Sequence, residues 1–420
     1  MHKTLILFSS LLFATQAVAV PSEQDVLNHY ADIAHATYQD SLNTAKALAQ
    51  SIDTLIAGPT EKNLAAARAA WKQARVPYQQ SEAFRFGNPI VDDWEGKVNS
   101  WPLDEGLIDY VAASYGGSSD ENPYYAANVI ANRKLMISGR SIDTSHIDKK
   151  LLAGTLQELD GIESNVATGY HAIEFLLWGQ DLNGTGPGAG NRPASDYNPK
   201  NCSWGNCDRR ADYLKSAIGL LVDNLEWMTR QWAGDGAARQ ALLNNPQQGI
   251  AVILTGMGSL SYGEMAGERM KLGLMLHDPE EEQDCFSDNT HASHFFDALG
   301  IRNVYLGRYR RADGTYVGGP SVSDLVKAKS PEVDAEVRAK LDATMDAMNT
   351  LYLRALATES YDQMIAEGNA EGNKVVQNAI DALLAQTKAL ERAVAVLDLK
   401  AIEFEGSDSI NAPAKVSEGG

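Results

Sequence analysis

The fold is decided by the stretch Val376-Gln-Asn-Ala-Ile380-Asp-Ala-Leu383-Leu-Ala-Gln-Thr387-Lys-Ala-Leu390-Glu-Arg-Ala-Val394-Ala-Val-Leu397. Its apolar residues, together with one threonine, are separated by alternating steps of four and three residues. That spacing places them along one face of an α-helix, where they form a seam that packs against neighbouring helices. The stretch therefore predicts a helical bundle.

The same spacing runs through most of the chain. Apolar residues recur at helical intervals over residues 26–55 and 64–78, with Ser22 and Thr60 as candidate N-caps and Gly58-Pro59 as a break. Strand signals are scarce, so the predicted fold class is all-α. Further helices are predicted at 146–160, 165–178, 209–232, 247–276, 289–299 and 332–366.

The length of 420 residues is enough for two domains or more. We expect two helical-bundle domains, residues 20–185 and 209–405, joined by a loop at 186–208 that is rich in Gly, Pro and Asn. Two pairs of segments are faintly alike, which suggests either an internal duplication or a coincidence: 164–174 with 287–297, and 78–85 with 262–269.

The N-terminus has the pattern of a secretory signal. Lys3 precedes an apolar run over residues 5–14, and Ala17-Val18-Ala19 offers a small-residue cleavage site. The run is too short for a membrane-spanning helix, and no later stretch reaches that length. We expect residues 1–19 to be a signal peptide and the mature chain to be exported, to the periplasm or envelope of a Gram-negative cell.

The chain is strongly acidic, with a formal net charge of −19. Such a chain is not expected to bind nucleic acid or an anionic membrane surface through its overall field. Acidity favours cations as ligands, although it is also common in proteins that only need to stay in solution.

Three cysteines are present. Cys202 and Cys207 lie in the Gly/Pro/Asn-rich loop, and in an exported protein a local disulfide between them is favoured. Cys285 is left over as a free buried thiol, or it pairs with one of the other two. Metal ligation by the cysteines is the less favoured alternative.

The clearest chemical signal is Gly169-Tyr-His171-Ala-Ile-Glu174, which lies in an almost wholly apolar run. In a helix, His171 and Glu174 share a face, so the imidazole and the carboxylate lie close together. A lone charge there is costly, so the pair needs each other, other polar groups or a metal. The spacing itself is weak evidence, because a His followed three residues later by an acid occurs four times in the chain.

Five segments in order resemble the imelysin-like family, and within it the iron-regulated protein A branch. The resemblance spans residues 25–400, nearly all of the expected mature chain. The segments are Trp71-Lys-Gln-Ala-Arg75-Val-Pro-Tyr78-Gln-Gln-Ser-Glu82-Ala-Phe-Arg85-Phe-Gly87, Trp101-Pro-Leu-Asp104, Gly169-Tyr-His171-Ala-Ile-Glu174, Gly263-Glu264-Met-Ala-Gly-Glu268-Arg269-Met270 and Cys285-Phe-Ser-Asp288-Asn-Thr-His291.

The resemblance implies an all-helical fold of two bundle-like domains, an envelope location and a role in bacterial iron acquisition. It also implies a metal site, because the Gly-x-His-x-x-Glu signature, which His171 and Glu174 match, has been interpreted as one. Members of the family have been labelled peptidases.

We therefore consider His171 and Glu174 as ligands of iron, with zinc or another divalent ion as the alternative. Two ligands are too few. Glu82 is the first candidate for a third, because it follows Pro77 and lies near Arg85 in the chain, and Asp104 is the next. The competing interpretation is a buried His–Glu hydrogen bond that joins two helices.

Other charged residues are weaker candidates. Glu264 and Glu268 form a charged face with Arg269. This face is either solvated and paired, or it lines, together with Arg85, the interdomain cleft that would contain His171 and Glu174. Asp288 and His291 form either a second cation site or an ordinary capped helix start.

The sequence supports three functions. The first is binding of iron or an iron chelate and its transfer to an envelope uptake system. The second is an envelope metallopeptidase, although the two-histidine zinc signatures are absent and residue 175 is Phe where the inverted form needs His. The third is binding of a polymer or partner protein through the aromatic loop at 94–124.

Overall fold

The computed structural model describes residues 20–117, 119, 122–399 and 402–418. The predicted signal peptide, residues 1–19, lies outside them. Within the described residues helices dominate and the strands form two short antiparallel hairpins, so the all-α prediction is confirmed. No helix in this part of the chain is both long enough and apolar enough to cross a membrane.

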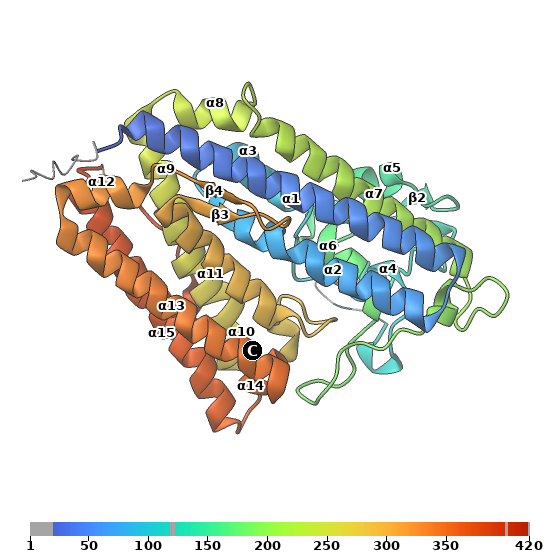
Figure 1. Cartoon of the computed structure of the whole chain (residues 1–420). Helices are drawn as coiled ribbons and strands as arrows, with labels where there is room; N and C mark the ends of the chain where they lie inside the picture. The colour runs from blue at the N-terminus through green and yellow to red at the C-terminus, as the bar shows by residue number, and fades with distance from the viewer. Residues whose placement is uncertain (1–19, 118, 120–121, 400–401, 419–420) are drawn as a thin grey trace, which may run out of the picture.

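The first helical layer contains the long helices α1, α2 and α7, which lie side by side (Figure 1). Ser22 and Thr60 accept hydrogen bonds at the starts of α1 and α2, which confirms both predicted N-caps. The short helix α6 packs against α2 and α7. The helices of this half are α1 (Glu23–Ala57), α2 (Glu61–Ser81), α3 (Pro89–Glu95), α4 (Glu105–Ile108), α5 (Lys149–Leu151), α6 (Gly169–Trp178), α7 (Cys207–Gln231) and α8 (Ala237–Leu243).

The second layer is built around α15, whose seam packs against α13 and against a π-helical stretch, η6. Helix α11 contacts both α13 and α2, so it joins the two layers. The elements are α9 (Pro246–Ser259), η6 (Leu260–Lys271), α10 (Leu272–Leu276), α11 (Thr290–Leu306), α12 (Val322–Lys329), α13 (Pro331–Ala357), α14 (Tyr361–Ile365), α15 (Ala370–Val396), α16 (Asp408–Asn411) and α17 (Pro413–Glu418).

The strands of the described residues pair into two hairpins, and the second of them contacts both α1 and α11. The strand pairs are β1 (Lys134–Ile137) with β2 (Arg140–Asp143), and β3 (Arg308–Arg310) with β4 (Tyr316–Gly318). Cys202 and Cys207 form the predicted local disulfide, and Cys285 is a free thiol.

The buried apolar side chains form one connected core that runs through both layers. The domain limits and the internal duplication therefore stay predictions. Of the predicted helix at 146–160, residues 149–156 are helical, as α5 followed by a π-helical turn at Leu152–Leu156, and the predicted helix at 332–366 is divided into α13 and α14.

Candidate functional site

His171 and Glu174 lie on α6, and both side chains are completely buried. His171 Nδ1 is 3.1 Å from Glu174 Oε2, as expected for residues three apart on one helix. Gly169 starts this helix with a φ of +85°, and a Cβ atom there would lie 2.4 Å from the carbonyl oxygen of Val98. Only glycine tolerates both this φ and this close approach to a carbonyl oxygen. Gly169 therefore fixes where α6 begins, and with it the position of His171 and Glu174.

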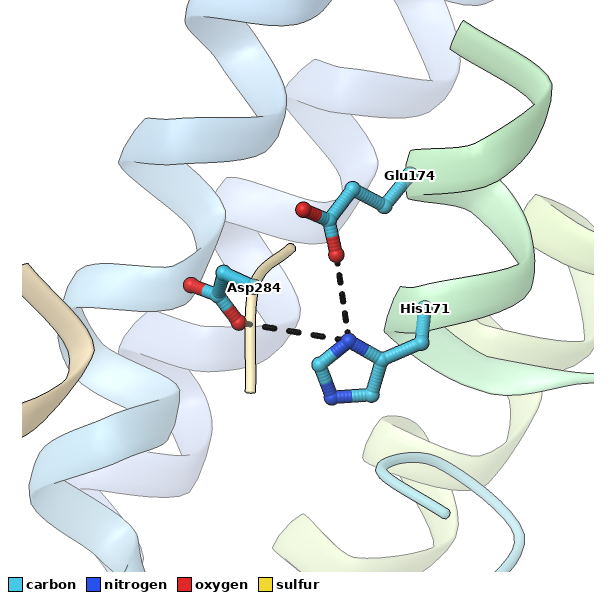
Figure 2. Close-up of side chains that lie close together, drawn as sticks. All are labelled: His171, Glu174 and Asp284. Atoms are coloured by element: carbon cyan, nitrogen blue, oxygen red, sulfur yellow. Dashed lines mark hydrogen bonds and ion pairs between the residues drawn. The ribbon is translucent and has the colours of Figure 1, made fainter. Parts of the chain in front are cut away.

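A second carboxylate lies at this pair, that of Asp284, which is also completely buried. It lies on the loop between η7 (Pro279–Glu281) and α11, and its Oδ1 is 3.9 Å from His171 Nδ1. One donor atom from each of the three residues lies within 4.8 Å of the other two. Figure 2 shows the Glu174 and Asp284 carboxylates both directed toward the imidazole.

Several donors hold the Asp284 carboxylate in place. Arg75, on α2, donates from Nη2 to Asp284 Oδ1 over 2.8 Å and from Nη1 to Asn99 Oδ1 over 2.5 Å. Ser293 Oγ and Asn289 Nδ2 donate to Asp284 Oδ2 over 2.5 and 3.0 Å. The Asp284 carboxylate therefore joins α2, on one layer, to the start of α11, on the other.

Burial decides the protonation of the cluster. It raises the pKa of Glu174 well above its usual value, and the Asp284 charge raises it further. It lowers the pKa of His171 to about 3, with a contribution from the Arg75 charge. Burial opposes ionisation of Asp284, but Arg75 and the other donors hold its pKa at about 2. Burial thus disfavours the charged forms of His171 and Glu174, whereas Asp284 forms an ion pair with Arg75 over 2.8 Å.

This donor set fits a divalent metal. One imidazole nitrogen and two carboxylate oxygens suit iron, zinc or manganese, and a cation would compete with protons for these ligands because metals bind their deprotonated forms. The buried Nε2 of His171 and Oγ of Ser287 have no hydrogen-bond partner, so the polar demand here is not fully met by the protein. The His–Glu hydrogen bond of the competing interpretation is present in the same geometry.

Glu82, the first predicted third ligand, is engaged elsewhere. Its Oε2 accepts from Arg269 Nη2 over 2.6 Å. The same guanidinium contacts Glu264 at 2.7 Å and Asp297 at 3.0 Å. Burial opposes ionisation of Glu264, but Arg269 and then Arg85 lower its pKa below the usual value. These residues form a buried ionic network, so the face that includes Glu264 is paired.

Arg85 joins this network, 3.5 Å from Glu264 and 3.0 Å from Asp92, whereas Glu268 is exposed. The remaining predicted site residues are dispersed. Asp104 accepts from Asn122 over 2.5 Å and from Ser164 over 2.7 Å, at the edge of a cavity of about 750 Å³. Asp288 belongs to a second acidic group, and His291 borders a different cavity of about 800 Å³.

Asp284 was missed by the sequence analysis. It lies one residue before the segment 285–291 that carries part of the family resemblance, and 110 residues from Glu174, so no local periodicity connects them. Its position beside a recognised segment was the available signal.

The helical layers and the buried His–Glu–Asp cluster between them define an all-helical protein with a candidate metal centre. A sequence model of the family Imelysin, peptidase family M75, matches residues 34–390, so the chain belongs to the imelysin family. Over 98 residues it is 31% identical to iron-regulated protein A of Synechococcus elongatus, an alignment that spans 23% of this chain and 28% of that relative.

Two crystal structures share the fold. One, described as an iron-regulated protein A precursor from Parabacteroides distasonis, has a TM-score of 0.64 at 19% identity and covers 90% of this chain and 96% of that one. The other, an imelysin-like protein from Psychrobacter arcticum, has a TM-score of 0.61 at 15% identity, with 92% and 100% covered.

Proposed function

We propose that this protein binds iron, or an iron-bearing ligand, at His171, Glu174 and Asp284 and acts in bacterial iron acquisition. One observation carries the proposal: three ligand-type side chains, all completely buried, bring their donor atoms within 4.8 Å of one another. The similarity to a protein named for iron regulation in Synechococcus elongatus supports iron over other divalent ions.

Binding and release, without covalent chemistry, is the activity that this geometry favours. The ligands come from α6 and from the loop that leads into α11, so a relative movement of these elements opens or closes the site. Because the ligands bind metal in their deprotonated forms, acidification favours release. An exported chain of this kind would hold iron in the envelope and pass it to an uptake system.

The test is the metal content and iron affinity of the protein purified from the export compartment. His171→Ala and Glu174→Gln are compared with the wild type, and Asp346→Asn, an exposed acid on α13, is the control for a change of charge. Stoichiometric iron in the wild type and the control, lost in both site variants, supports the proposal. A folded wild type without iron affinity, with both variants merely less stable, would show that the cluster is structural.

A metallopeptidase is the second candidate, because the matching family model carries a peptidase name. It requires chelator-sensitive cleavage of an unfolded protein, lost in Glu174→Ala. The complete burial of His171, Glu174 and Asp284 counts against it, since a peptide must reach the metal. No cleavage across several substrates and metals would remove this candidate.

Partner or polymer binding is the third candidate. The loop at 94–124 contributes Trp101 and Tyr115 to the cavity of about 750 Å³, which Tyr125 also borders. Trp101→Ala combined with Tyr115→Ala should then abolish capture of a partner and leave iron binding intact. The reverse pattern would count against this function.

A further inference from the structure

A second group of acids lies apart from the His171 cluster. Glu282 and Asp288 belong to the loop that precedes α11, and Asp362 lies in the first turn of α14. One carboxylate oxygen from each lies within 4.8 Å of the other two. The group shares no residue with the His171 cluster, and it joins two segments that are far apart in the sequence.

These carboxylates lack the partners that other buried acids have. Glu282 and Asp362 are each 1% exposed, and Glu282 Oε1 and Asp288 Oδ1 have no hydrogen-bond partner. Among the described residues no Arg or Lys forms an ion pair with any of the three. The Lys72 ammonium, whose charge acts on Asp288, donates to the Ser287 carbonyl over 3.0 Å.

By contrast, the buried carboxylates of Asp109 and Asp297 lie 2.7 and 3.0 Å from the guanidiniums of Arg192 and Arg269. Burying a charge without such a partner is costly. Three clustered acids without one therefore mark a place where a cation is missing from the protein's own side chains.

A small cavity adjoins the group. Its volume is about 10 Å³, and Glu282 and Asp362 border it. A space of that size holds about one water molecule or one ion. Three further carboxylates border the same cavity, those of Glu105, Asp181 and Glu280.

A buried hydroxyl lies beside these acids. Tyr361 is completely buried, its Oη has no hydrogen-bond partner, and it is near enough to Glu282 to experience that carboxylate's charge. Tyr361 directly precedes Asp362 in the chain, so this hydroxyl is a neutral oxygen that the protein leaves without a partner at the start of the same helix.

We propose that Glu282, Asp288 and Asp362 form a second cation site, which takes a hard divalent ion such as Mn²⁺ or Ca²⁺. Carboxylate oxygens are the ligands that these ions prefer. The three acids include no imidazole, and the free thiol of Cys285 borders the cavity among five carboxylates. A divalent ion replaces the repulsion among the acids with attraction. The His171 cluster, with its nitrogen donor, is chemically different.

The proposal is tested by calorimetric titration of Mn²⁺ into the full-length mature chain, which is first treated with a chelator to remove bound metal. His171→Ala provides a background in which the first site is disabled, so failure of the iron proposal and failure of this one are distinguishable. On that background Mn²⁺ binding should persist, and Asp362→Asn should weaken it by about tenfold or more, because ligand charge sets cation affinity. Glu282→Gln should do the same, whereas Asp346→Asn should have no effect.

Two results would overturn the second site. One is a folded His171→Ala variant that binds no Mn²⁺, and the other is unchanged binding after both Asp362→Asn and Glu282→Gln.

Thermal melting gives an independent test of the second cation site if one variant folds poorly. Without cation, Asp362→Asn or Glu282→Gln should melt at a higher temperature than the parent, because repulsion among the acids is reduced. Mn²⁺ should raise the parent's Tm but not that of the variants. If both variants melt at a lower temperature and Mn²⁺ leaves the parent unchanged, the acids are satisfied within the protein and the site does not exist.

Discussion

At the scale of single residues, the Arg75 guanidinium controls the Asp284 carboxylate. It is almost completely buried and packs over the rings of Trp71, Tyr78 and Tyr170, 5.1 to 5.6 Å from their centroids. Its charge is therefore held against Asp284 by shape as well as by attraction. A buried acid that loses its cation is far more costly than one that never had it.

Arg75→Met should reduce the free energy of unfolding by about 3–5 kcal/mol, because Asp284 remains buried without a counter-charge. Denaturant unfolding monitored by circular dichroism measures the change. The double variant Arg75→Met/Asp284→Asn should recover much of the loss. A double variant no more stable than Arg75→Met alone would show that Arg75 acts through its ring contacts and not through Asp284.

Gly169 sets the position of His171 and Glu174, the candidate metal ligands on α6. Gly169→Ala should cost about 1–3 kcal/mol of folding stability, because alanine is strained at a positive φ and its Cβ meets the Val98 carbonyl. The same unfolding measurement applies, with Gly154→Ala as the control, since nothing lies within 4 Å of a Cβ there. Equal effects at the two positions would contradict the structural role of Gly169.

The residue scale also shows where sequence reasoning succeeds. His171 and Glu174 were found because one turn of helix brings them together, and local spacing suffices for that. Asp284 is brought to them by packing between the layers, through Arg75 on α2 and Ser293 on α11. Glu82 was chosen on chain position alone, which carried no information about its partner Arg269, 187 residues away.

At the scale of elements, predicted helices fit where caps and apolar seams agree. Helix α1 begins after Ser22 and ends at Gly58, as expected. The break between α13 and α14 was missed, although the Ser360 capping box marks it. The hairpin of β3 and β4 was also missed, although Asp313-Gly314, a common turn dipeptide, lies between its strands. At Ser360 helical periodicity outweighed the local turn signal, whereas the strands beside Asp313-Gly314 have only three residues each, too few to show an alternating pattern.

One carboxylate connects three elements of the first layer. Asp109 follows α4 and accepts from Arg192 Nη1 over 2.7 Å, in the loop at 186–208, and from Arg210 Nε over 2.6 Å, on α7. Burial opposes ionisation of Asp109, but the two guanidiniums lower its pKa below the usual 3.8. The loop at 186–208, which contains Cys202 of the disulfide, is thus linked to α7 by ion pairs through Asp109.

The folded-state pKa of Asp109 is depressed, so its contribution to stability is fully present above pH 3.8 and is lost as the pH falls through the lower folded value. Asp109→Asn should cost about 3–5 kcal/mol at pH 7, since two guanidiniums lose their charged partner. Its unfolding free energy should also fall less steeply than that of the wild type below about pH 4. Unfolding curves measured from pH 7 to pH 2.5 test this, and parallel pH profiles would refute it.

At the scale of the whole molecule, the candidate iron site has no open face. His171, Glu174 and Asp284 are all completely buried, with α6 on one side and the loop before α11, held by Arg75 of α2, on the other (Figure 2). The acidic surface, with a formal net charge of −19, concentrates cations near the protein. It does not bring them to the ligands, so entry depends on a separation of the two sides.

This burial makes a kinetic prediction. In stopped-flow mixing with Fe²⁺ under anaerobic conditions, the observed binding rate should rise with iron concentration and then reach a plateau set by the opening rate. The signal is tryptophan fluorescence, because Trp71 and Trp178 pack with ring centroids 5.4 Å apart beside α6. His171→Ala should lack this phase. At the plateau, salt should leave the rate unchanged, whereas at low iron it should slow binding by screening the acidic field. A rate that stays linear with iron concentration would mean that the site opens faster than iron arrives, and that the buried cluster is already accessible in solution.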